Sequence, residues 1–156
     1  MEFVVHYNKV YKSLIMTIKD SSLSGIANCV YNLKSGDLYF YDSFVISEIF
    51  EGVTVVKEDL TEVINLIRKH YGFKNPYGLI SHRLHSYSIN LLDILPVSNQ
   101  FGLLVANAVV GYNEFSFKNF ELEKRLLKLD GESFFDLNDA IRWTNQKVET
   151  ARSLSR

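Results

Sequence analysis

The sequence predicts an α/β domain, whose mixed β-sheet opens in an antiparallel meander and is backed by about three to four helices. Two observations predict this class. Between residues 28 and 50, three short runs rich in aromatic and β-branched residues are separated by tight turns, which is typical of neighbouring antiparallel strands. From residue 56 onward, apolar residues recur at helical spacing and alternate with further strand-like runs.

The predicted meander consists of strands at residues 29–33, 38–41 and 44–50. We expect Gly36 to supply the conformation of the first turn, and Gly52 to end the third strand. Such short connections leave antiparallel pairing as the natural arrangement of the three strands.

A helix is predicted over residues 56–71. Its apolar face is formed by Val56, Leu60, Val63, Ile64, Ile67 and Tyr71. Asp59 followed by Glu62 is compatible with a capping box, and Gly72 stands where a C-terminal cap belongs.

The remaining elements follow the same logic. We expect a short buried strand at 77–81, an irregular segment at 82–100 and a central strand at 103–110 that is covered on both faces. A helix then begins near Asn113, a short strand lies at 134–135, and Asp136 caps a final helix. The domain organisation is therefore an N-terminal extension at 1–27 that shows no sustained period, a single domain at 28–147 and a polar tail at 148–156.

Composition excludes several classes of function. The formal net charge of -1 and a pI near 6.4 give no basic surface for nucleic acid or for an anionic membrane. Cys29 is the only cysteine, so the chain can form neither an internal disulfide nor a cysteine-based zinc site. The longest apolar stretch, 101–110, is too short to span a bilayer. We expect a cytoplasmic protein that has no cofactor, no nucleic-acid partner and no membrane insertion.

The densest polar cluster follows the predicted strand at 77–81, where open α/β sheets usually bind ligands. This candidate binding or regulatory loop consists of His82, Arg83, His85, Ser86, Tyr87 and Ser88.

Three chemical functions of the loop can be weighed. His82 and His85 could ligate a metal, but a third ligand would have to come from His6, His70, Glu48 or Glu51. A serine could act as a nucleophile with a histidine, although no Gly-x-Ser-x-Gly elbow is present. Arg83 and the serine hydroxyls could hold an anion, although no glycine-rich phosphate loop accompanies them. We therefore predict no metal site and no enzyme activity.

The structural interpretation of the loop is favoured over all three. A strand end must satisfy its last backbone groups, and serine, histidine and arginine are well suited to do so. We expect Arg83 to pair with a carboxylate and Tyr87 to be at least partly buried.

Several motifs resemble the STAS-like, or SpoIIAA-like, family of small bacterial proteins, which is related in fold to CRAL-TRIO lipid-binding domains. The first is residues 39–49 with Glu51 and Gly52, and the second is 77–83 with 86–88 close behind. Segments 112–114, 121–124 and 140–143 complete the similarity, which covers roughly residues 38–144. The family commonly carries asparagine where this chain has His82 and His85, which argues against an obligatory metal site.

The resemblance implies a mixed sheet backed by helices and a non-enzymatic role. In STAS-type regulators a serine at the start of a helix is phosphorylated to switch partner binding, and neither Ser86 nor Ser88 can be assigned to that position. We expect a regulatory or protein-interaction module whose partner is another protein or a second copy of the chain. The alternative is a carrier or sensor of a small apolar ligand or lipid, which would need a cavity of about 300 Å³ or more.

Overall fold

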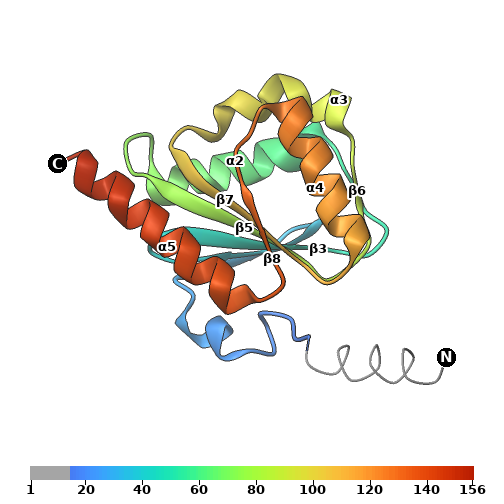
Figure 1. Cartoon of the computed structure of the whole chain (residues 1–156), viewed down its shortest axis with the longest axis horizontal. Helices are drawn as coiled ribbons and strands as arrows, with labels where there is room; N and C mark the ends of the chain where they lie inside the picture. The colour runs from blue at the N-terminus through green and yellow to red at the C-terminus, as the bar shows by residue number, and fades with distance from the viewer. Residues whose placement is uncertain (1–14) are drawn as a thin grey trace.

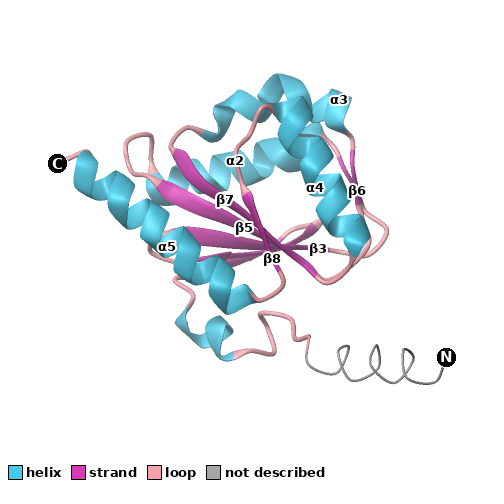
Figure 2. Ribbon diagram, in the orientation of Figure 1, coloured by secondary structure: helices cyan, strands magenta, loops and turns pink. Residues whose placement is uncertain are grey.

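The computed structural model describes residues 15–156, and the predictions for earlier residues, including His6, lie outside this described part. Six strands form the main sheet in the order β1-β2-β3-β5-β7-β8, and two more, β4 and β6, form a small parallel pair (Figures 1 and 2). The strands are β1 (Cys29–Asn32), β2 (Gly36–Phe40), β3 (Phe44–Ile49), β4 (Thr54–Val55), β5 (Tyr77–Arg83), β6 (Ser88–Ile89), β7 (Leu104–Gly111) and β8 (Glu132–Phe134).

The sheet is mixed, as the sequence predicts. The pairs β1–β2 and β2–β3 are antiparallel, while the pairs β3–β5, β5–β7 and β7–β8 are parallel. Parallel neighbours need long crossovers, and helices supply them. The helices are α2 (Lys57–Tyr71), α3 (Leu91–Ile94), α4 (Glu114–Leu127) and α5 (Leu137–Leu154), with 3-10 helices η1 (Ser22–Ile26) and η2 (Leu95–Phe101).

Helices cover both faces of the sheet. The crossover helices α2, α3 and α4 lie with η2 on one face, and α5 crosses the other face over β5 and β7 (Figure 1). Side chains alternate along each strand, so neighbouring residues join different cores. On β2, for example, Phe40 packs with Ile67 of α2, whereas Tyr39 belongs to the core that Ala140 of α5 closes.

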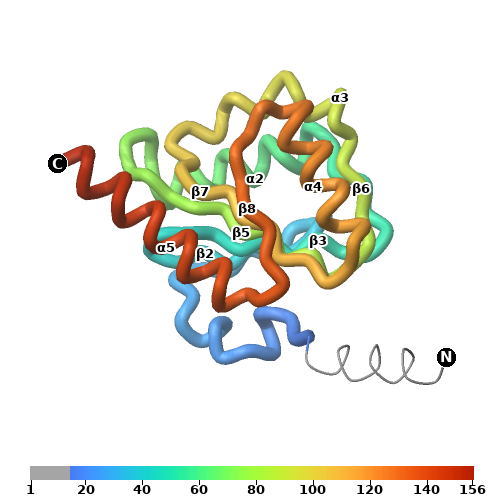
Figure 3. The backbone as a smooth tube through the Cα atoms, in the orientation of Figure 1, coloured from blue at the N-terminus to red at the C-terminus, as the bar shows by residue number. Residues whose placement is uncertain are grey.

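Residues 15–27, the described part of the predicted N-terminal extension, pack against the domain. Ile18 is fully buried in the core beneath α5, and its backbone N–H donates to Glu48 of β3 at 3.1 Å. Tyr41 donates from its hydroxyl to the carbonyl of Leu23 at 2.9 Å. The tube drawing shows this segment running below the start of α5 (Figure 3). Its irregular backbone explains why neither helical nor strand periodicity marks it in the sequence.

The C-terminal tail also belongs to the domain. Helix α5 continues to Leu154, where the sequence predicted a polar tail from residue 148. Val148 is buried, and Arg152 donates to the carbonyls of Pro76 and Asp42 at 3.1 and 2.9 Å. These contacts are made by parts of the chain far away in sequence, which a local composition argument does not include.

Gly36 and Asp59 have roles in the structure that differ from those predicted from the sequence. Gly36 has no positive φ and opens β2, and an added Cβ there would lie 2.3 Å from the carbonyl oxygen of Glu48. It is a close-approach glycine, not a turn glycine. Asp59 caps α2 from its third position, since its carboxylate accepts from the N–H of Val56 at 2.9 Å.

Strand β5 and helix α5 approach so closely that only glycine fits at position 78. We expect Gly78→Ala to lower the free energy of unfolding by about 1–3 kcal/mol, because the added Cβ would lie 2.2 Å from Cγ2 of Thr144. Adding Thr144→Ser removes that methyl group and should recover most of the loss in urea denaturation.

The control for this prediction is Gly25→Ala, where an added Cβ would meet nothing within 4 Å. It should change stability by no more than about 0.5 kcal/mol. A Gly78→Ala protein as stable as the control would contradict the packing described here.

Candidate functional site

The alternation of side chains along β5 separates the candidate loop into two sites. The strand continues to Arg83, two residues beyond its predicted end at Ser81. His82 therefore points to the face that α5 covers, and Arg83 points to the face beneath α2 and α4. The two residues that the sequence places side by side have different neighbours and different roles.

Arg83 forms a buried, bidentate ion pair with Glu123 of α4. Its Nη1 and Nη2 donate to Oε1 and Oε2 at 2.9 and 2.7 Å, and the side chains are 6% and 12% exposed. The guanidinium also lies 5.6 Å from the ring centre of Tyr87 and 5.8 Å from that of Phe120. Arginine suits this position because its planar fork matches a carboxylate and its faces pack on aromatic rings. The prediction that Arg83 pairs with a carboxylate is thus confirmed, and that carboxylate belongs to Glu123.

Helix α4 is placed so that Glu123 reaches Arg83. Asn113 caps it, accepting from the N–H of Ser116 at 2.9 Å, and Ser116 and Phe120 are buried on its inner face. Glu123 follows Phe120 by three residues and so lies on the same face. The opening turn is tight, since a Cβ at Gly111 would lie 2.9 Å from Cβ of Ser116.

An open groove of about 230 Å³ runs beside the ion pair. One wall is the side of α4 that carries Phe115, Asn119 and Leu122, and the other is the segment from Tyr87 to Leu91. Arg83 and Glu123 line its inner side. The groove lies at the carboxyl end of β5, where the sequence predicted a site.

A second, inner cavity of about 130 Å³ lies between the sheet and the helices α2 and α4. Arg83, Tyr87 and Glu123 line this cavity as well as the groove, so they separate the two spaces. Three polar side chains, Ser47, Ser81 and Asn107, contribute to its lining from β3, β5 and β7. The remaining lining is mainly apolar and includes Leu38, Val63, Leu79, Phe101, Val109 and Leu127.

The other loop residues lie at the rim of the groove. His85 is exposed, with its Nδ1 3.5 Å from a carboxylate oxygen of Glu51, and the N–H of Ser86 donates to the same carboxylate at 3.3 Å. Ser88 is exposed on β6, where its N–H donates to the carbonyl of Val53 at 2.9 Å. Of the six predicted residues, Arg83, Tyr87 and Ser88 therefore line the groove, His85 and Ser86 line a small neighbouring pocket, and His82 lies on the other face of the sheet. Neither serine begins a helix.

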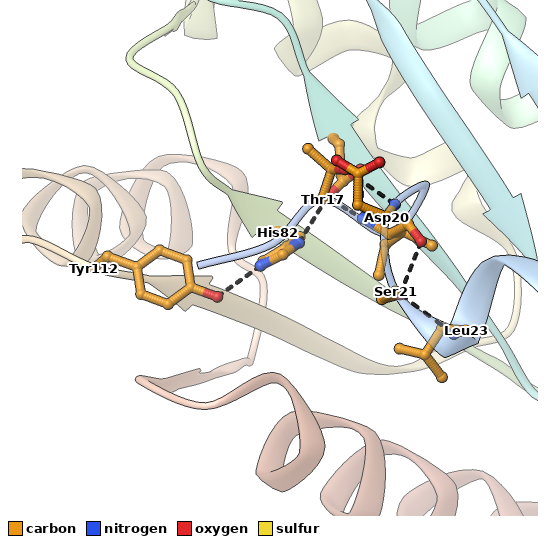
Figure 4. Close-up of polar contacts among 8 residues, drawn as sticks. Thr17, Asp20, Ser21, Leu23, His82 and Tyr112 are labelled. Carbon is orange, nitrogen blue, oxygen red and sulfur yellow. Dashed lines mark hydrogen bonds and ion pairs between the residues drawn. The ribbon is translucent and has the colours of Figure 1, made fainter. Parts of the chain in front are cut away.

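His82 lies at the centre of a buried hydrogen-bond chain on the opposite face (Figure 4). Its Nδ1 is 2.8 Å from Oε2 of Glu48, and its Nε2 is 2.6 Å from the hydroxyl of Tyr112. The same carboxylate accepts the backbone N–H of Ile18. Burial, followed by the charges of Asp136 and Glu48, raises the pKa of Tyr112 to about 12. This hydrogen-bond chain connects the carboxyl ends of β3, β5 and β7 with the N-terminal segment. Its residues Glu48, His82 and Tyr112 line neither the groove nor the inner cavity.

No group of three metal-ligating side chains occurs within residues 15–156. His82 and His85 diverge, since one is buried against Glu48 and the other is at the surface. His70 stacks on Phe40 with ring centres 4.2 Å apart and meets the hydroxyl of Tyr31 at 3.0 Å, and burial lowers its pKa. The described candidates are thus divided among three places: His82 contacts Glu48, His85 contacts Glu51, and His70 contacts Tyr31.

Sequence reasoning missed the residues of α4 that complete the site. Glu123 and Leu122 look like parts of a solvated charged helix, because lysines and arginines are interleaved with them. Phe115 shares one side of the helix with Leu122 and Leu126, as the sequence pattern predicts, and is 60% exposed. The available signal was the recurrence of Phe115, Leu122 and Leu126 at intervals of seven and four, a second apolar stripe on the same helix.

No family model and no curated protein matches this sequence. Among solved structures, the chain is similar to an uncharacterized protein from the DUF3478 family with a SpoIIAA-like fold from Shewanella loihica PV-4. The TM-score is 0.46 at 14% identity, over 74% of this chain and 90% of that one. Within the described residues, no helix is long and apolar enough to cross a membrane.

Removing Arg83 should be costly because Glu123 would remain buried without its partner. We expect Arg83→Ala to lower the free energy of unfolding by about 3 kcal/mol or more in denaturant melts. Lys118→Ala breaks the exposed pair with Glu114, 3.9 Å apart, and should cost at most about 0.5 kcal/mol. Equal stability of the two variants would show that the Arg83 pair is no more important than a surface contact.

Tyr112 should ionise at unusually high pH. The difference between the 295 nm titrations of the wild type and Tyr112→Phe should have its midpoint near pH 12 in the folded protein and near pH 10 in urea. Because the folded-state pKa is the higher one, the stabilisation that Tyr112 provides is complete below pH 10 and is lost as the pH rises towards 12. A folded-state midpoint near pH 10 would contradict the buried contact with His82.

Proposed function

We propose that this protein is a non-enzymatic interaction module that binds a protein partner along the outer side of α4. The single observation that carries this proposal is the apolar stripe of Phe115, Leu122 and Leu126, which are 60%, 49% and 47% exposed. At about 100° per residue, the three side chains fall within roughly 40° of one another around the helix. The inner face, with Ser116, Phe120 and Glu123, points about a quarter-turn away.

Helix α4 thus differs from the other long helices. An amphipathic surface helix normally buries its only apolar stripe, and α4 has a second one that the domain leaves uncovered. Exposed apolar side chains continue onto α3 and η2, where Leu92 and Leu95 are exposed and the helices contact α4. Contiguous apolar patches on a protein surface commonly mark sites of protein contact.

The groove defines the chemistry of the partner. Phe115 and Leu122 form one wall and are about 10 Å apart along the helix, from a rise of 1.5 Å per residue. A partner helix with apolar side chains at positions i and i+7 would match this spacing. Asn119 on the same wall, and Ser88 across the groove, offer hydrogen bonds at the edge.

Two features favour interaction over catalysis. Among the described residues, the acid–histidine–hydroxyl chain of Glu48, His82 and Tyr112 is the arrangement closest to a catalytic triad, and it faces α5 and the N-terminal segment instead of a cavity. In the groove, Arg83 is already paired with Glu123. A catalytic site needs a nucleophile or base that a substrate can reach, and neither arrangement supplies one.

The lipid-carrier alternative receives less support. A carrier of a drug-sized or larger apolar molecule needs a cavity of about 300 Å³ or more, and the inner cavity has about 130 Å³. The groove, at about 230 Å³, also falls short of that volume.

The partner can be sought by affinity capture from the cells that express the protein, with cross-linking, and each captured protein then tested by direct titration. A true partner should bind the wild type and lose about tenfold or more in affinity with Leu122→Glu, because a charge would enter an apolar contact. If the partner is a second copy of the chain, the same variant should shift the oligomeric state in light scattering.

The matched control is Leu154→Glu, the same change on the 83%-exposed side chain at the end of α5, on the opposite face. It should leave binding unchanged. Captured proteins that bind both variants alike, or hydrolase or phosphotransfer turnover that Ser86→Ala abolishes, would overturn the proposal.

A further inference from the structure

The inner cavity has a composition that a packed core does not explain. Its walls are apolar, but three neighbouring strands place polar side chains on its floor: Ser47, Ser81 and Asn107. We propose that this cavity is a binding site for a compact, uncharged molecule about the size of benzene that carries a hydrogen-bonding group, such as a small phenol. This proposal does not depend on the partner proposed for α4.

The strand register brings the three polar residues together. Ser47 and Ser81 are directly paired across β3 and β5. Leu79 is paired with Asn107 and Ser81 with Val109, so Asn107 lies diagonally next to Ser81 on β7. Directly paired side chains on one face of a sheet are about 5 Å apart and diagonal ones about 7–8 Å. A single small molecule can therefore reach all three.

These side chains make no hydrogen bond to any other part of the chain that the structure describes. The three side chains are partly exposed, so their polar groups exchange hydrogen bonds with solvent and are open to a ligand. A ligand with a hydroxyl or amide group can replace water on these groups while its apolar part contacts the apolar lining.

Size and charge narrow the ligand class. A cavity of roughly 150 Å³ lined by apolar side chains holds benzene, so about 130 Å³ fits a molecule of similar or slightly smaller size. The charges in the lining are already compensated: Arg83 pairs with Glu123, and Asp59 caps the first turn of α2. A charged ligand would lose its hydration without gaining a counter-ion, so a neutral one is favoured.

The lining also provides a route into the cavity. Ser47, Ser81, Asn107 and Leu79 each keep partial exposure although they lie beneath helices, so the cavity is connected to solvent. Arg83 and Tyr87 stand between the cavity and the open groove, with their side chains packed on each other. A rotation of the Tyr87 ring would widen this connection without moving the backbone.

The test is a titration of the full chain with phenol, followed by amide chemical shifts in ¹⁵N-labelled protein, with benzene as the comparison ligand. Phenol should bind saturably, and the largest shifts should fall on β3, β5 and β7. Benzene has the same ring without the hydroxyl and should bind about tenfold more weakly, which corresponds to the loss of one hydrogen bond.

Two kinds of variant distinguish the effect of filling the cavity from the effect of removing a hydrogen bond. Ser81→Leu places a larger side chain in the cavity and should abolish phenol binding, with Ser47→Val as a second filling variant should the first unfold. Asn107→Leu keeps the side-chain volume but removes the amide, and should reduce the preference for phenol over benzene. Ser43→Ala, in the turn before β3 and outside the lining, is the control and should bind like the wild type.

Three results would overturn the proposal. One is the absence of saturable phenol binding to the folded wild-type protein, in which case water molecules alone satisfy the floor. Another is binding with shifts confined to α4 and the groove. The third is unchanged binding in a folded Ser81→Leu or Ser47→Val protein.

Discussion

Helix α4 packs on the sheet around one buried charge, the guanidinium of Arg83. Arg83 is the last residue of β5, and it pairs with Glu123 of α4. Burying two charges costs several kcal/mol each, and their attraction recovers this only in good geometry. The bidentate contact at 2.7 and 2.9 Å provides that geometry. The pair therefore specifies where α4 lies more than it adds net stability. Both cavities depend on this placement, since Arg83 and Glu123 line each of them.

The position of α4 also explains why its outer stripe is uncovered. Once Glu123 is fixed towards Arg83, Ser116 and Phe120 must face inward, and Phe115 and Leu122 are turned to the side. The helix cannot rotate to bury them without exposing the buried charge pair. The charge pair thus holds an apolar stripe at the surface, as the proposed partner contact requires.

Much of the fold could be predicted from local patterns. The strands of the meander, the period of α2 and its end at Gly72, and the caps at Asn113 and Asp136 all follow from residues close together in sequence. The mixed sheet followed from the order of these elements. Three of the six predicted residues, Arg83, Tyr87 and Ser88, line the groove at the carboxyl end of β5, and a functional role for them stays a prediction.

What could not be predicted depends on contacts between distant parts of the chain. Glu123 lies 40 residues beyond Arg83, and only the packing of α4 reveals it as the partner. The extension of β5 by two residues places His82 and Arg83 on opposite faces, which a loop assignment cannot show. The floor of the inner cavity draws one residue from each of three strands, and each of the three looks unremarkable in its own segment. The N-terminal segment at 15–27 is recognisable as part of the domain only through its contacts with distant residues, such as Glu48 and Tyr41.

The central claim is that Arg83 and Glu123 act as one unit that fixes α4 on the sheet. A double-mutant cycle of Arg83→Met and Glu123→Met, measured by the free energy of unfolding in urea, tests it most directly. Each single variant should lose about 3 kcal/mol or more because a charge stays buried without a partner, and the double variant should lose far less than the sum. A double variant that loses the full sum of the two single losses would contradict the account, because the two side chains would then contribute independently.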